Sequence, residues 1–506
     1  MKIKLEGHNY KYAVEQIMLA LFPGERPDYS ADCIVSSAEP ILESRLRLGE
    51  SYAQATTVMH CDGKVSHGYA RVKRDKLTNK LVTDRLLQRI IKQSFYRAAN
   101  IFIETPPVWG SLTGIRPAHL AAAAIESGIS EKNAAKALIR DYYVAPERAE
   151  LCTDAARASL ALKQTLQRRD IALYIGIPFC PTRCAYCSFV SNSVEKSFEL
   201  TEPFVRTLIN EITAAADTLR DLNLRVIAVY IGGGTPTVLP EEALEAVMRA
   251  VKTSFDLSHI REYTVEAGRP DTITAKKLET AVRFGAGRVC VNPQSMSPDV
   301  LTAIGRRHTP GDALSAVKLV RQSGMALNMD LIAGLPGDTG ESFRYSLNTV
   351  TDLDPENITV HTLSLKKGSR IMLENTAIPS GAVVSDMLGY ASGRLRERGY
   401  NPYYLYRQKF TSGGFENTGW SLPGYEGIYN ICMMEELCTV LSFGGGGVTK
   451  LVSGQGKTAV SPGGAPAVRI ERIFNAKYPR EYILSADKAA YKMNRIKNFI
   501  SQHLSA

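Results

Sequence analysis

Between residues 170 and 370, short apolar runs alternate with longer segments whose apolar residues recur at helical spacing. Strands that alternate with helices in this way are typical of a parallel sheet built from right-handed β-α units. We predict strands at 171–178, 225–230, 262–267, 288–292, 326–333 and 357–365, which make six units. Six units rather than eight predict an α/β fold, a partial (β/α)6 barrel of the TIM type. Its chemistry should gather at the C-terminal ends of the strands.

The pattern differs on both sides of this barrel. Residues 1–165 predict an α+β and helical module, with short strands at the N-terminus and near 32–36 and 52–60. Its helices are expected at 11–21, at 82–100 and across 118–164, with breaks at 128–130 and 144–146. After residue 375, a helix at 383–398 precedes a segment rich in aromatic residues and glycine. We therefore predict three domains: 1–165, the barrel at 166–375, and an α+β extension on the substrate side at 376–506.

The chain carries a formal net charge of +10, which indicates an acidic partner. Nucleic acid and a small molecule with several carboxylates both meet that requirement. The positive charge is densest between residues 64 and 97, and we interpret this run as the solvated face of a helix. Its cations are Lys64, Arg71, Lys73, Arg74, Lys76, Lys80, Arg85, Arg89, Lys92 and Arg97.

No membrane or export segment is evident in the sequence. There is no run of 18 or more apolar residues, and the N-terminus lacks the apolar core of a signal peptide. We therefore expect a cytoplasmic protein without a membrane span. That compartment is reducing, so its cysteines are more often metal ligands than disulfide partners.

Three cysteines lie within eight positions, in Cys180-Pro-Thr-Arg-Cys184-Ala-Tyr-Cys187, directly after the first predicted strand. Thiolates this close together favour a soft metal or an iron-sulfur cluster over disulfides. Structural zinc is the alternative, but it usually takes four ligands in two pairs, and no second pair is near. The other cysteines, at 33, 61, 152, 290, 432 and 438, are scattered, and we expect most to be buried small hydrophobes.

The C-x3-C-x2-C spacing of this loop resembles the signature of the radical S-adenosylmethionine (SAM) superfamily. The resemblance implies a [4Fe-4S] cluster bound by Cys180, Cys184 and Cys187, whose fourth iron stays open and chelates the amino and carboxylate groups of SAM. It also implies one-electron cleavage of SAM to methionine and a 5'-deoxyadenosyl radical. The electron would come from a donor such as flavodoxin or ferredoxin.

Motifs at the predicted strand ends resemble SAM-binding positions of the same superfamily. They are Gly232-Gly-Gly-Thr-Pro-Thr237, Glu266, Asn292-Pro-Gln294-Ser-Met296, Ala303-Ile-Gly-Arg306-Arg-His308 and Asn328-Met-Asp330-Leu-Ile-Ala-Gly334-Leu-Pro-Gly337. Taken singly, Glu266 could be a solvated charge, Arg306 a member of an ion pair, and Asp330 a cap or turn residue. The resemblance implies cofactor contacts by Tyr174, Tyr186, Gly233, Gly234, Thr235, Glu266, Gln294, Arg306 and Asp330.

From about 165 to 480 the chain resembles the branch of oxygen-independent coproporphyrinogen III oxidases. The C-terminal segments that carry this likeness are Glu416-Asn-Thr-Gly-Trp-Ser-Leu-Pro423-Gly-Tyr-Glu426-Gly-Ile-Tyr429-Asn430 and Phe443-Gly-Gly-Gly-Gly-Val-Thr449. Trp109-Gly-Ser-Leu-Thr-Gly-Ile-Arg-Pro117 and Asn475-Ala-Lys-Tyr-Pro-Arg-Glu-Tyr482 are similar to its HemZ-type subgroup, the coproporphyrinogen dehydrogenases. The chain departs from the oxidase pattern at three positions. Gly176 and Tyr429 replace histidines, and Phe189 stands where the oxidase proper has a fourth cysteine.

The resemblance implies a tetrapyrrole substrate, with oxidative decarboxylation of coproporphyrinogen III propionates to vinyl groups, giving protoporphyrinogen IX in haem biosynthesis. Cationic side chains, arginine above all, hold carboxylates well, so Arg116, Arg407 and Lys409 are candidate anchors for the propionates. The loop at 109–117 that carries Arg116 could equally be a linker that packs Trp109 into the core of the first module.

Three other functions stay open on the sequence. They are a haem-binding chaperone, a radical SAM enzyme that modifies haem or another tetrapyrrole, and an RNA-modifying enzyme that uses the basic stretch at 64–97. We favour tetrapyrrole chemistry over nucleic acid, because the C-terminal segments resemble the porphyrinogen branch and no RNA-binding signature lies in residues 1–165.

Overall fold

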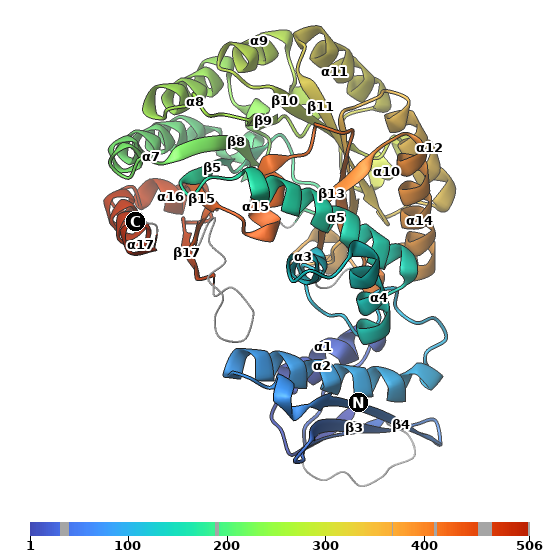
Figure 1. Cartoon of the computed structure of the whole chain (residues 1–506). Helices are drawn as coiled ribbons and strands as arrows, with labels where there is room; N and C mark the ends of the chain where they lie inside the picture. The colour runs from blue at the N-terminus through green and yellow to red at the C-terminus, as the bar shows by residue number, and fades with distance from the viewer. Residues whose placement is uncertain (31–39, 188–191, 367, 409–411, 454–467, 504–506) are drawn as a thin grey trace. The chain divides into compact units, whose positions relative to one another are not determined.

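The computed structural model describes residues 1–30, 40–187, 192–366, 368–408, 412–453 and 468–503. They belong to two compact units (Figure 1). The first contains Met1–Thr153 and Gly413–Phe415, and the second begins at Asp154 and contains nearly all of the remaining chain. Among the helices of these described residues, none is long and apolar enough to cross a membrane.

A four-stranded sheet forms the base of the first unit. Its order is β1 (Lys2–Glu6), β2 (Ile41–Leu48), β3 (Tyr52–Cys61) and β4 (Lys64–Lys73), with β1 parallel to β2 and the other pairs antiparallel. Buried and exposed residues alternate along β4, because successive side chains of a strand point to opposite faces. The buried face packs against α1 (Lys11–Leu21) and α2 (Lys80–Ala99), as their apolar spacing predicts. The predicted strand at 32–36 lies outside the described residues.

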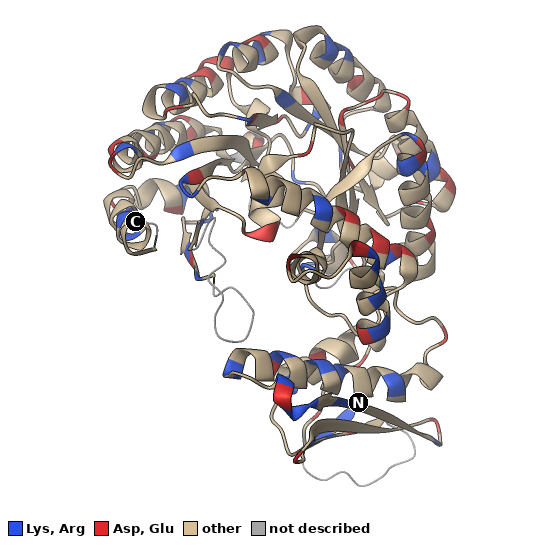
Figure 2. Ribbon diagram, in the orientation of Figure 1, with Lys and Arg blue, Asp and Glu red and all other residues tan. Residues whose placement is uncertain are grey.

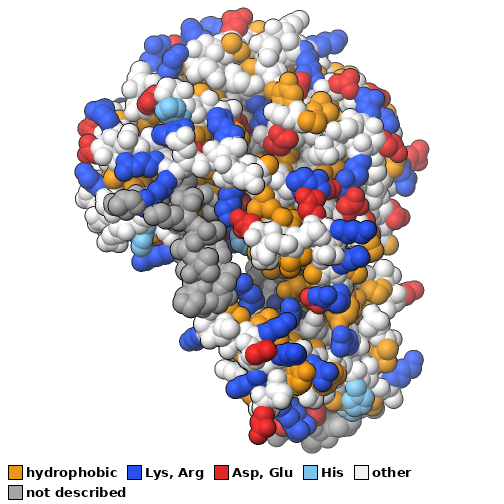
Figure 3. Space-filling view, viewed as in Figure 1, with side chains coloured by type: hydrophobic (Ala, Val, Ile, Leu, Met, Phe, Trp, Pro, Cys, Tyr) orange, Lys and Arg blue, Asp and Glu red, His pale blue; other side chains and the backbone are white. Residues whose placement is uncertain are grey.

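The basic run at 64–97 is not the single helix face that we predicted. Its first half lies on β4 and on the short 3-10 helix Arg74–Lys76, and only the second half lies on α2, where Figure 2 shows cationic positions along the helix. The period of two along β4 turns Arg71 and Lys73 to the exposed face, and Lys64 is exposed at the start of the strand. On the face shown in Figure 3, Lys and Arg side chains are interspersed with Asp and Glu.

The glycine- and proline-containing segment at 109–117 is packed into the first unit. Trp109 is only 1% exposed. The backbone N–H of Ser111 donates to the carbonyl of Tyr142 at 2.8 Å, and that of Ala145 donates to the carbonyl of Val108 at 2.8 Å. This burial supports the linker interpretation of the segment. The helices α3 (Ala118–Glu126), α4 (Glu131–Tyr142) and α5 (Pro146–Thr165) follow it, broken where the sequence predicts.

Six parallel strands form the centre of the second unit, in chain order from β5 to β12. They are β5 (Asp170–Ile177), β8 (Arg225–Gly233), β9 (Glu262–Glu266), β10 (Arg288–Gln294), β11 (Ala326–Ala333) and β12 (Asn357–Thr362). Helices connect them and lie along the outer side of the strands in Figure 1: α7 (Thr201–Asp221), α8 (Glu241–Ser254), α9 (Ala275–Arg283), α10 (Pro298–Ala303), α11 (Pro310–Ser323) and α12 (Gly340–Thr351). The predicted partial barrel is confirmed.

Residues after 375, which we predicted as a separate domain, extend the same sheet on both sides to eleven strands. On one side β14 (Glu416–Ser421) pairs antiparallel with β12, and β13 (Asn401–Arg407) pairs with β14. On the other side β15 (Thr439–Gly444) is parallel to β5 and is followed by β16 (Val448–Val452) and β17 (Ile470–Phe474). The accompanying helices are α13 (Arg370–Leu373), α14 (Gly381–Glu397), α15 (Ile428–Glu435), α16 (Pro479–Leu484) and α17 (Lys488–His503).

A buried carboxylate, that of Glu211 on α7, links the C-terminal helices to the barrel. Its Oε1 lies 2.9 Å from Nζ of Lys492 on α17, and its Oε2 accepts hydrogen bonds from the hydroxyl of Tyr482 at 2.6 Å and the backbone N–H of Gly444 at 2.9 Å. Asn475 donates to the same carboxylate at 3.0 Å. The two ends of the Asn475–Tyr482 motif therefore meet at a satisfied buried charge, which gives this motif a structural role.

Lys492→Met is expected to lower the free energy of unfolding by about 3–5 kcal/mol, because it leaves Glu211 buried without its cation. Lys497→Met is the matched control. Lys497 lies on the same helix and pairs with Asp221 of α7 at 3.1 Å, but the two side chains are 51% and 56% exposed. An exposed pair contributes at most about 1 kcal/mol. Urea unfolding of both variants measures the difference, and equal losses would contradict the structural role of Glu211.

Candidate functional site

One cavity of about 330 Å³ opens at the C-terminal ends of the parallel strands in the second unit. Residues from the cysteine loop and from β8, β9, β10, β11 and β12 line it. Of the predicted site residues, the cavity lining contains Cys180, Cys184, Tyr186, Cys187, Gly233, Gly234, Thr235, Glu266, Gln294, Arg306 and Asp330. The fold thus brings into one place residues that are up to 150 positions apart in the chain, from Cys180 to Asp330.

The cysteine loop is held against the barrel through its backbone. The N–H of Ala185 donates to the carbonyl of Ile304 at 3.0 Å, and the N–H of Cys187 donates to the carbonyl of Cys184 at 3.1 Å in a tight turn. Cys180 lies on the short strand β6 (Phe179–Cys180), which pairs with β7 (Asn192–Ser193), and its Sγ accepts a hydrogen bond from Oγ1 of Thr235 at 3.5 Å. The loop and the end of β8 therefore fix the first thiol.

The electrostatics of the loop favour a thiolate. Burial alone would raise the pKa of the Cys184 thiol, but the guanidinium groups of Arg306 and Arg269 outweigh burial and lower it. Arg269 lies close enough for its Nη1 to donate to Sγ of Cys184 at 3.9 Å. Because the thiolate is the form that binds metal, this environment suits an iron ligand.

The donor set fits an iron-sulfur cluster. Among the described residues, no three His, Cys, Asp or Glu side chains meet closely enough to hold a single metal ion. In a four-iron cluster, by contrast, each thiolate binds a different iron, so the sulfurs do not converge on one point. Cys180, Cys184 and Cys187 line the same cavity, and no other described cysteine does. These three residues would hold the cluster.

Two positions of the 232–237 motif must be glycine, because neighbouring atoms occupy the space that a Cβ would need. A Cβ at Gly234 would lie 2.4 Å from the backbone oxygen of Phe179, in the segment that leads to Cys180. A Cβ at Gly232 would lie 2.6 Å from Oε2 of Glu266. Small residues here let the cysteine segment and the Glu266 carboxylate pack directly on the end of β8.

Glu266 and Asp330 form an acidic pair in the cavity. Burial and, after it, the nearby Asp330 carboxylate together raise the pKa of Glu266 to about 8. Asn292 donates to Oε1 of Glu266 at 3.4 Å, and Asn328 donates to Oδ1 of Asp330 at 2.8 Å. Both carboxyl groups are therefore oriented by neighbouring amides and are available to accept hydrogen bonds from a ligand.

Several buried polar atoms of the lining have no hydrogen-bond partner among the residues that the structure describes. They are Oδ1 of Asn292, Oε1 of Gln294 and Nε of Arg306. Gln294 also has a backbone φ of 68°, a left-handed conformation that is uncommon for a residue with a side chain, at an irregularity in the pairing of β10 with β11. Buried polar atoms are normally satisfied, so these atoms are expected to be satisfied by a ligand. Strain of this kind is concentrated at functional sites.

Tyr174 is the one predicted cofactor contact that the described cavity lining does not include. Its ring stacks with those of Tyr230 and Tyr429, at centroid distances of 6.3 and 5.9 Å. The same ring lies beside Gly176, where an added Cβ would be 3.1 Å from Cε1 of Tyr174. The aromatic stack therefore fills the space between positions 176 and 429, the two positions where the oxidase pattern has histidine.

Two of the three candidate substrate anchors are not among the residues that line the cavity. Neither Arg116 nor Arg407 is among its lining residues, and Lys409 lies outside the described residues. The cations that do line it are Arg269, Arg306, Lys366 and His361. We chose these anchors because they are cations close to motifs in the sequence. Each strand end presents only one or two side chains to the cavity, so closeness in sequence does not place a side chain there. Arg269 follows the end of β9 by three positions, and His361 is the second-last residue of β12. Position at the C-terminal end of a strand was therefore the sequence signal that could have identified them.

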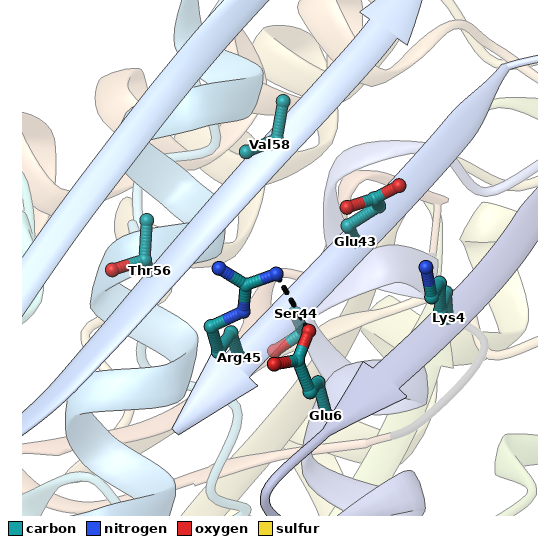
Figure 4. A pocket seen from close by; sticks show the side chains of 7 residues that line it. All are labelled: Lys4, Glu6, Glu43, Ser44, Arg45, Thr56 and Val58. Atoms are coloured by element: carbon teal, nitrogen blue, oxygen red, sulfur yellow. Dashed lines mark ion pairs between the residues drawn. The ribbon is translucent and has the colours of Figure 1, made fainter. Parts of the chain in front are cut away.

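A second cavity, of about 150 Å³, lies on the exposed face of the sheet in the first unit (Figure 4). Lys4, Glu6, Glu43 and Arg45 line it from the adjacent strands β1 and β2. Arg45 pairs with Glu6 at 2.6 Å. Cations and carboxylates of this groove thus neutralise each other across the strands, which is typical of a solvated sheet surface.

Comparisons with known proteins identify the relatives of this chain. The sequence model of the Radical SAM superfamily matches residues 174–350. The oxygen-independent coproporphyrinogen-III oxidase-like protein HemZ of Bacillus subtilis is 41% identical over 380 residues, which are 74% of each chain. The heme chaperone HemW of Haemophilus influenzae is 28% identical over 49% of this chain, and the match spans 64% of that protein. The structure of coproporphyrinogen III oxidase (HemN) from Escherichia coli aligns with a TM-score of 0.47 at 19% identity, covering 68% of this chain and 82% of that one.

A partial barrel with three thiols at the mouth of its strand-end cavity defines the class, radical SAM proteins, whose members bind a [4Fe-4S] cluster and SAM. Within that class the chain belongs to the family of the coproporphyrinogen-III oxidase-like protein HemZ. The family predicted from the sequence is confirmed.

Replacing Cys180, Cys184 or Cys187 by Ala is expected to abolish the cluster, because each removal takes away one of the thiolates in the cavity. Iron and sulfide analysis of anaerobically reconstituted protein measures this directly. Cys438→Ala is the control, since Cys438 is buried in the core away from the cavity lining. A full complement of iron in Cys180→Ala would show that the ligands lie elsewhere.

The raised pKa of Glu266 predicts a dependence of stability on pH in the SAM-free protein. A carboxyl whose folded pKa exceeds its unfolded pKa stabilises fully below the unfolded value, roughly 4.3, and this stability is lost as the pH rises. The loss is complete above the folded pKa of about 8. Glu266→Gln is therefore expected to raise the melting temperature at about pH 9 and to change it little at about pH 5.

Calorimetry of wild type, Glu266→Gln and the exposed control Glu242→Gln at both pH values would test this dependence. A Glu266→Gln effect that is the same at both pH values, or that is matched by the control, would contradict the buried, protonated carboxyl.

Proposed function

We propose that the protein is a radical SAM enzyme that acts on a tetrapyrrole. The reaction that we infer is the oxygen-independent oxidative decarboxylation of coproporphyrinogen III propionates to vinyl groups. The observation that carries this proposal is the continuity of one cavity. Its lining includes both the cysteine loop and an aromatic wall from the C-terminal segments.

The aromatic wall suits a flat, largely apolar ring system. Tyr404 and Tyr406 of β13 line the cavity with their rings 6.2 Å apart and nearly parallel, at 9°. Met434 of α15 and Leu363 add apolar surface. Polar groups at the same end come from Asn417, Asn430 and Gln408. A mostly apolar wall with a few fixed polar groups is the usual composition of a site for a ring-shaped ligand.

The cations of the cavity fall into two groups. Arg269 is paired with Asp271 at 3.1 Å and donates to Thr182, and Arg306 donates to backbone carbonyls and to Tyr186. These two arginines serve the cysteine end. Lys366, which follows β12, has no such role at the cysteine end and is our candidate for contact with a substrate carboxylate. It replaces Arg116, Arg407 and Lys409 as the expected anchor.

When bound, the cluster and SAM supply a radical able to remove a hydrogen atom from an unactivated carbon. The chain's own residues then have three tasks: Glu266, Gln294, Arg306 and Asp330 are positioned to bind SAM, the tyrosines exclude water from the reacting carbon, and Lys366 orients a propionate. For each vinyl group formed, the propionate loses one hydrogen atom and carbon dioxide. The remaining electron passes to an external one-electron acceptor, so atoms and electrons balance.

A haem-binding chaperone is the second candidate function. Several relatives carry the name heme chaperone HemW, at 27–30% identity over about half of this chain. Gly176 and Tyr429 replace two histidines of the oxidase pattern, and Tyr429 stacks on Tyr174 and Tyr230. This replacement also favours the chaperone. Such a protein would bind haem in the cavity without turning over a porphyrinogen.

Anaerobic incubation with SAM, a one-electron reductant and coproporphyrinogen III tests the proposal. We expect deoxyadenosine and carbon dioxide to form in equal amounts, because each hydrogen removed leads to one decarboxylation. Cys184→Ala is the control that removes the cluster chemistry. Deoxyadenosine without carbon dioxide would contradict this substrate, and stoichiometric haem binding without turnover would favour the chaperone.

A further inference from the structure

His361 has both ring nitrogens engaged by acceptors from neighbouring strands. It lies on β12 and lines the cavity, with its side chain 26% exposed. Its Nε2 is 3.5 Å from Oδ2 of Asp330 on β11, and its Nδ1 is 3.3 Å from Oδ1 of Asn417 on β14. Nothing in the sequence motifs pointed to this histidine.

The orientation of the Asn417 amide is fixed by two further hydrogen bonds. Its Oδ1 accepts the backbone N–H of Thr362 at 3.0 Å, and its Nδ2 donates to the carbonyl of Tyr406 at 3.4 Å. An inverted amide would place an NH2 group against a backbone N–H and an oxygen against a carbonyl, which is unfavourable. The atom that faces Nδ1 of His361 is therefore an acceptor.

The other nitrogen of His361 also faces an acceptor. Asp330 accepts a hydrogen bond from Asn328 on Oδ1 at 2.8 Å, which leaves Oδ2 directed at Nε2 of His361. An imidazole that meets acceptors on both sides can satisfy both only with a proton on each nitrogen. The geometry of the two neighbours thus selects the imidazolium form.

The charges around the ring act in the same direction. Burial alone would lower the pKa of His361, but Asp330, with help from Asn417 and Glu266, outweighs burial and raises it. Tyr230, Tyr404 and Tyr406 also face this acidic centre, and burial raises the pKa of each phenol, so all three are neutral. Lys366 lines the same cavity. The imidazolium therefore stands beside two carboxyl groups.

We propose that His361 is a positioning residue for the SAM end of the cavity. Fixed as an imidazolium by Asn417, it aligns the Asp330 carboxylate and offsets its negative charge beside Glu266. Through this chain of contacts, β14 from the C-terminal segment supports a residue of the cofactor site. The inference does not depend on the identity of the substrate. It rests on the assignment of Asp330 to SAM binding, and the experiments separate the two.

Nitrogen NMR of the cluster-loaded protein, with 15N-labelled histidine, tests the protonation state. At about pH 8 a histidine of ordinary pKa, roughly 6.5, is mostly neutral. The resonances of His361 are those that disappear from the spectrum of His361→Asn. In the wild-type protein at this pH we expect them to show that both ring nitrogens are still protonated. In Asn417→Ala and Asp330→Asn the same ring should become neutral at lower pH. An ordinary titration of His361 that neither change alters would overturn the proposal.

A double-mutant cycle on SAM affinity tests the positioning role. Loss of a charge-assisted hydrogen bond corresponds to roughly tenfold or more in affinity, so Asp330→Asn and His361→Asn should each weaken SAM binding by about that factor. If His361 acts through Asp330, the double variant should bind hardly more weakly than either single variant.

Equilibrium dialysis with labelled SAM gives these affinities, and His259→Asn, at an exposed position before β9, is the matched control. Wild-type affinity in His361→Asn alone, or fully additive losses, would overturn the role of His361. If Asp330→Asn also binds SAM with wild-type affinity, Asp330 does not bind SAM, and His361 cannot position it for SAM. The NMR experiment would still report the protonation state of His361.

Discussion

One buried guanidinium, that of Arg306, connects the cysteine loop to the strand ends. Its Nη1 donates to the carbonyls of Asn292 at 2.6 Å and Gly268 at 3.3 Å, and its Nη2 donates to the hydroxyl of Tyr186 at 3.0 Å. The same charge lowers the pKa of Cys184. This cation therefore helps to fix the loop and, together with Arg269, stabilises the thiolate of Cys184. Because a buried cation needs compensating acceptors, this arrangement also favours a negatively charged cluster next to it.

The barrel could be predicted from sequence because its strands are buried on both sides. The apolar run at 326–333 predicts β11 at its observed bounds, and the other five parallel strands differ from prediction only at their ends. The antiparallel strand β14 shows no such signal. Its residues, Glu416 to Ser421, are all buried, yet most are polar or glycine. They are satisfied by partners far away in the chain, such as Thr362, whose backbone N–H and hydroxyl bond to Asn417 and Glu416.

The site, like the barrel, could be predicted from sequence only where a local pattern marks its residues. Residues in contiguous motifs, such as Gly234 and Asp330, could be assigned from the resemblance, and the fold brings them to one cavity. Arg269 and His361 were missed, because their importance depends on contacts that no local pattern shows. His361 meets Asn417 from 56 positions away. Tyr174 could be placed on the right strand, but its side chain packs into the tyrosine stack, a choice that depends on Tyr230 and Tyr429.

The two ends of the cavity are built from different parts of the chain. The cysteine loop and β8 to β11 supply the thiols, carboxylates and arginines with some tyrosines and amides, whereas β13, β14 and α15 supply only tyrosines, amides and a methionine. The His361–Asn417 contact is one of the places where these two parts meet. A change of substrate within the family could therefore arise in the C-terminal segment while the cofactor end keeps its residues. This separation is consistent with one fold serving relatives that are named as an oxidase-like protein and as heme chaperones.

The central claim is that the cluster held by Cys180, Cys184 and Cys187 has an open iron that binds SAM inside this cavity. Electron-nuclear double resonance of the reduced protein, with SAM labelled by 15N in its amino group and 17O in its carboxylate, tests it most directly. The account predicts hyperfine coupling of both labels to the cluster and a change in its EPR signal when SAM is added. Bound SAM without coupling, and with an unchanged EPR signal, would contradict it.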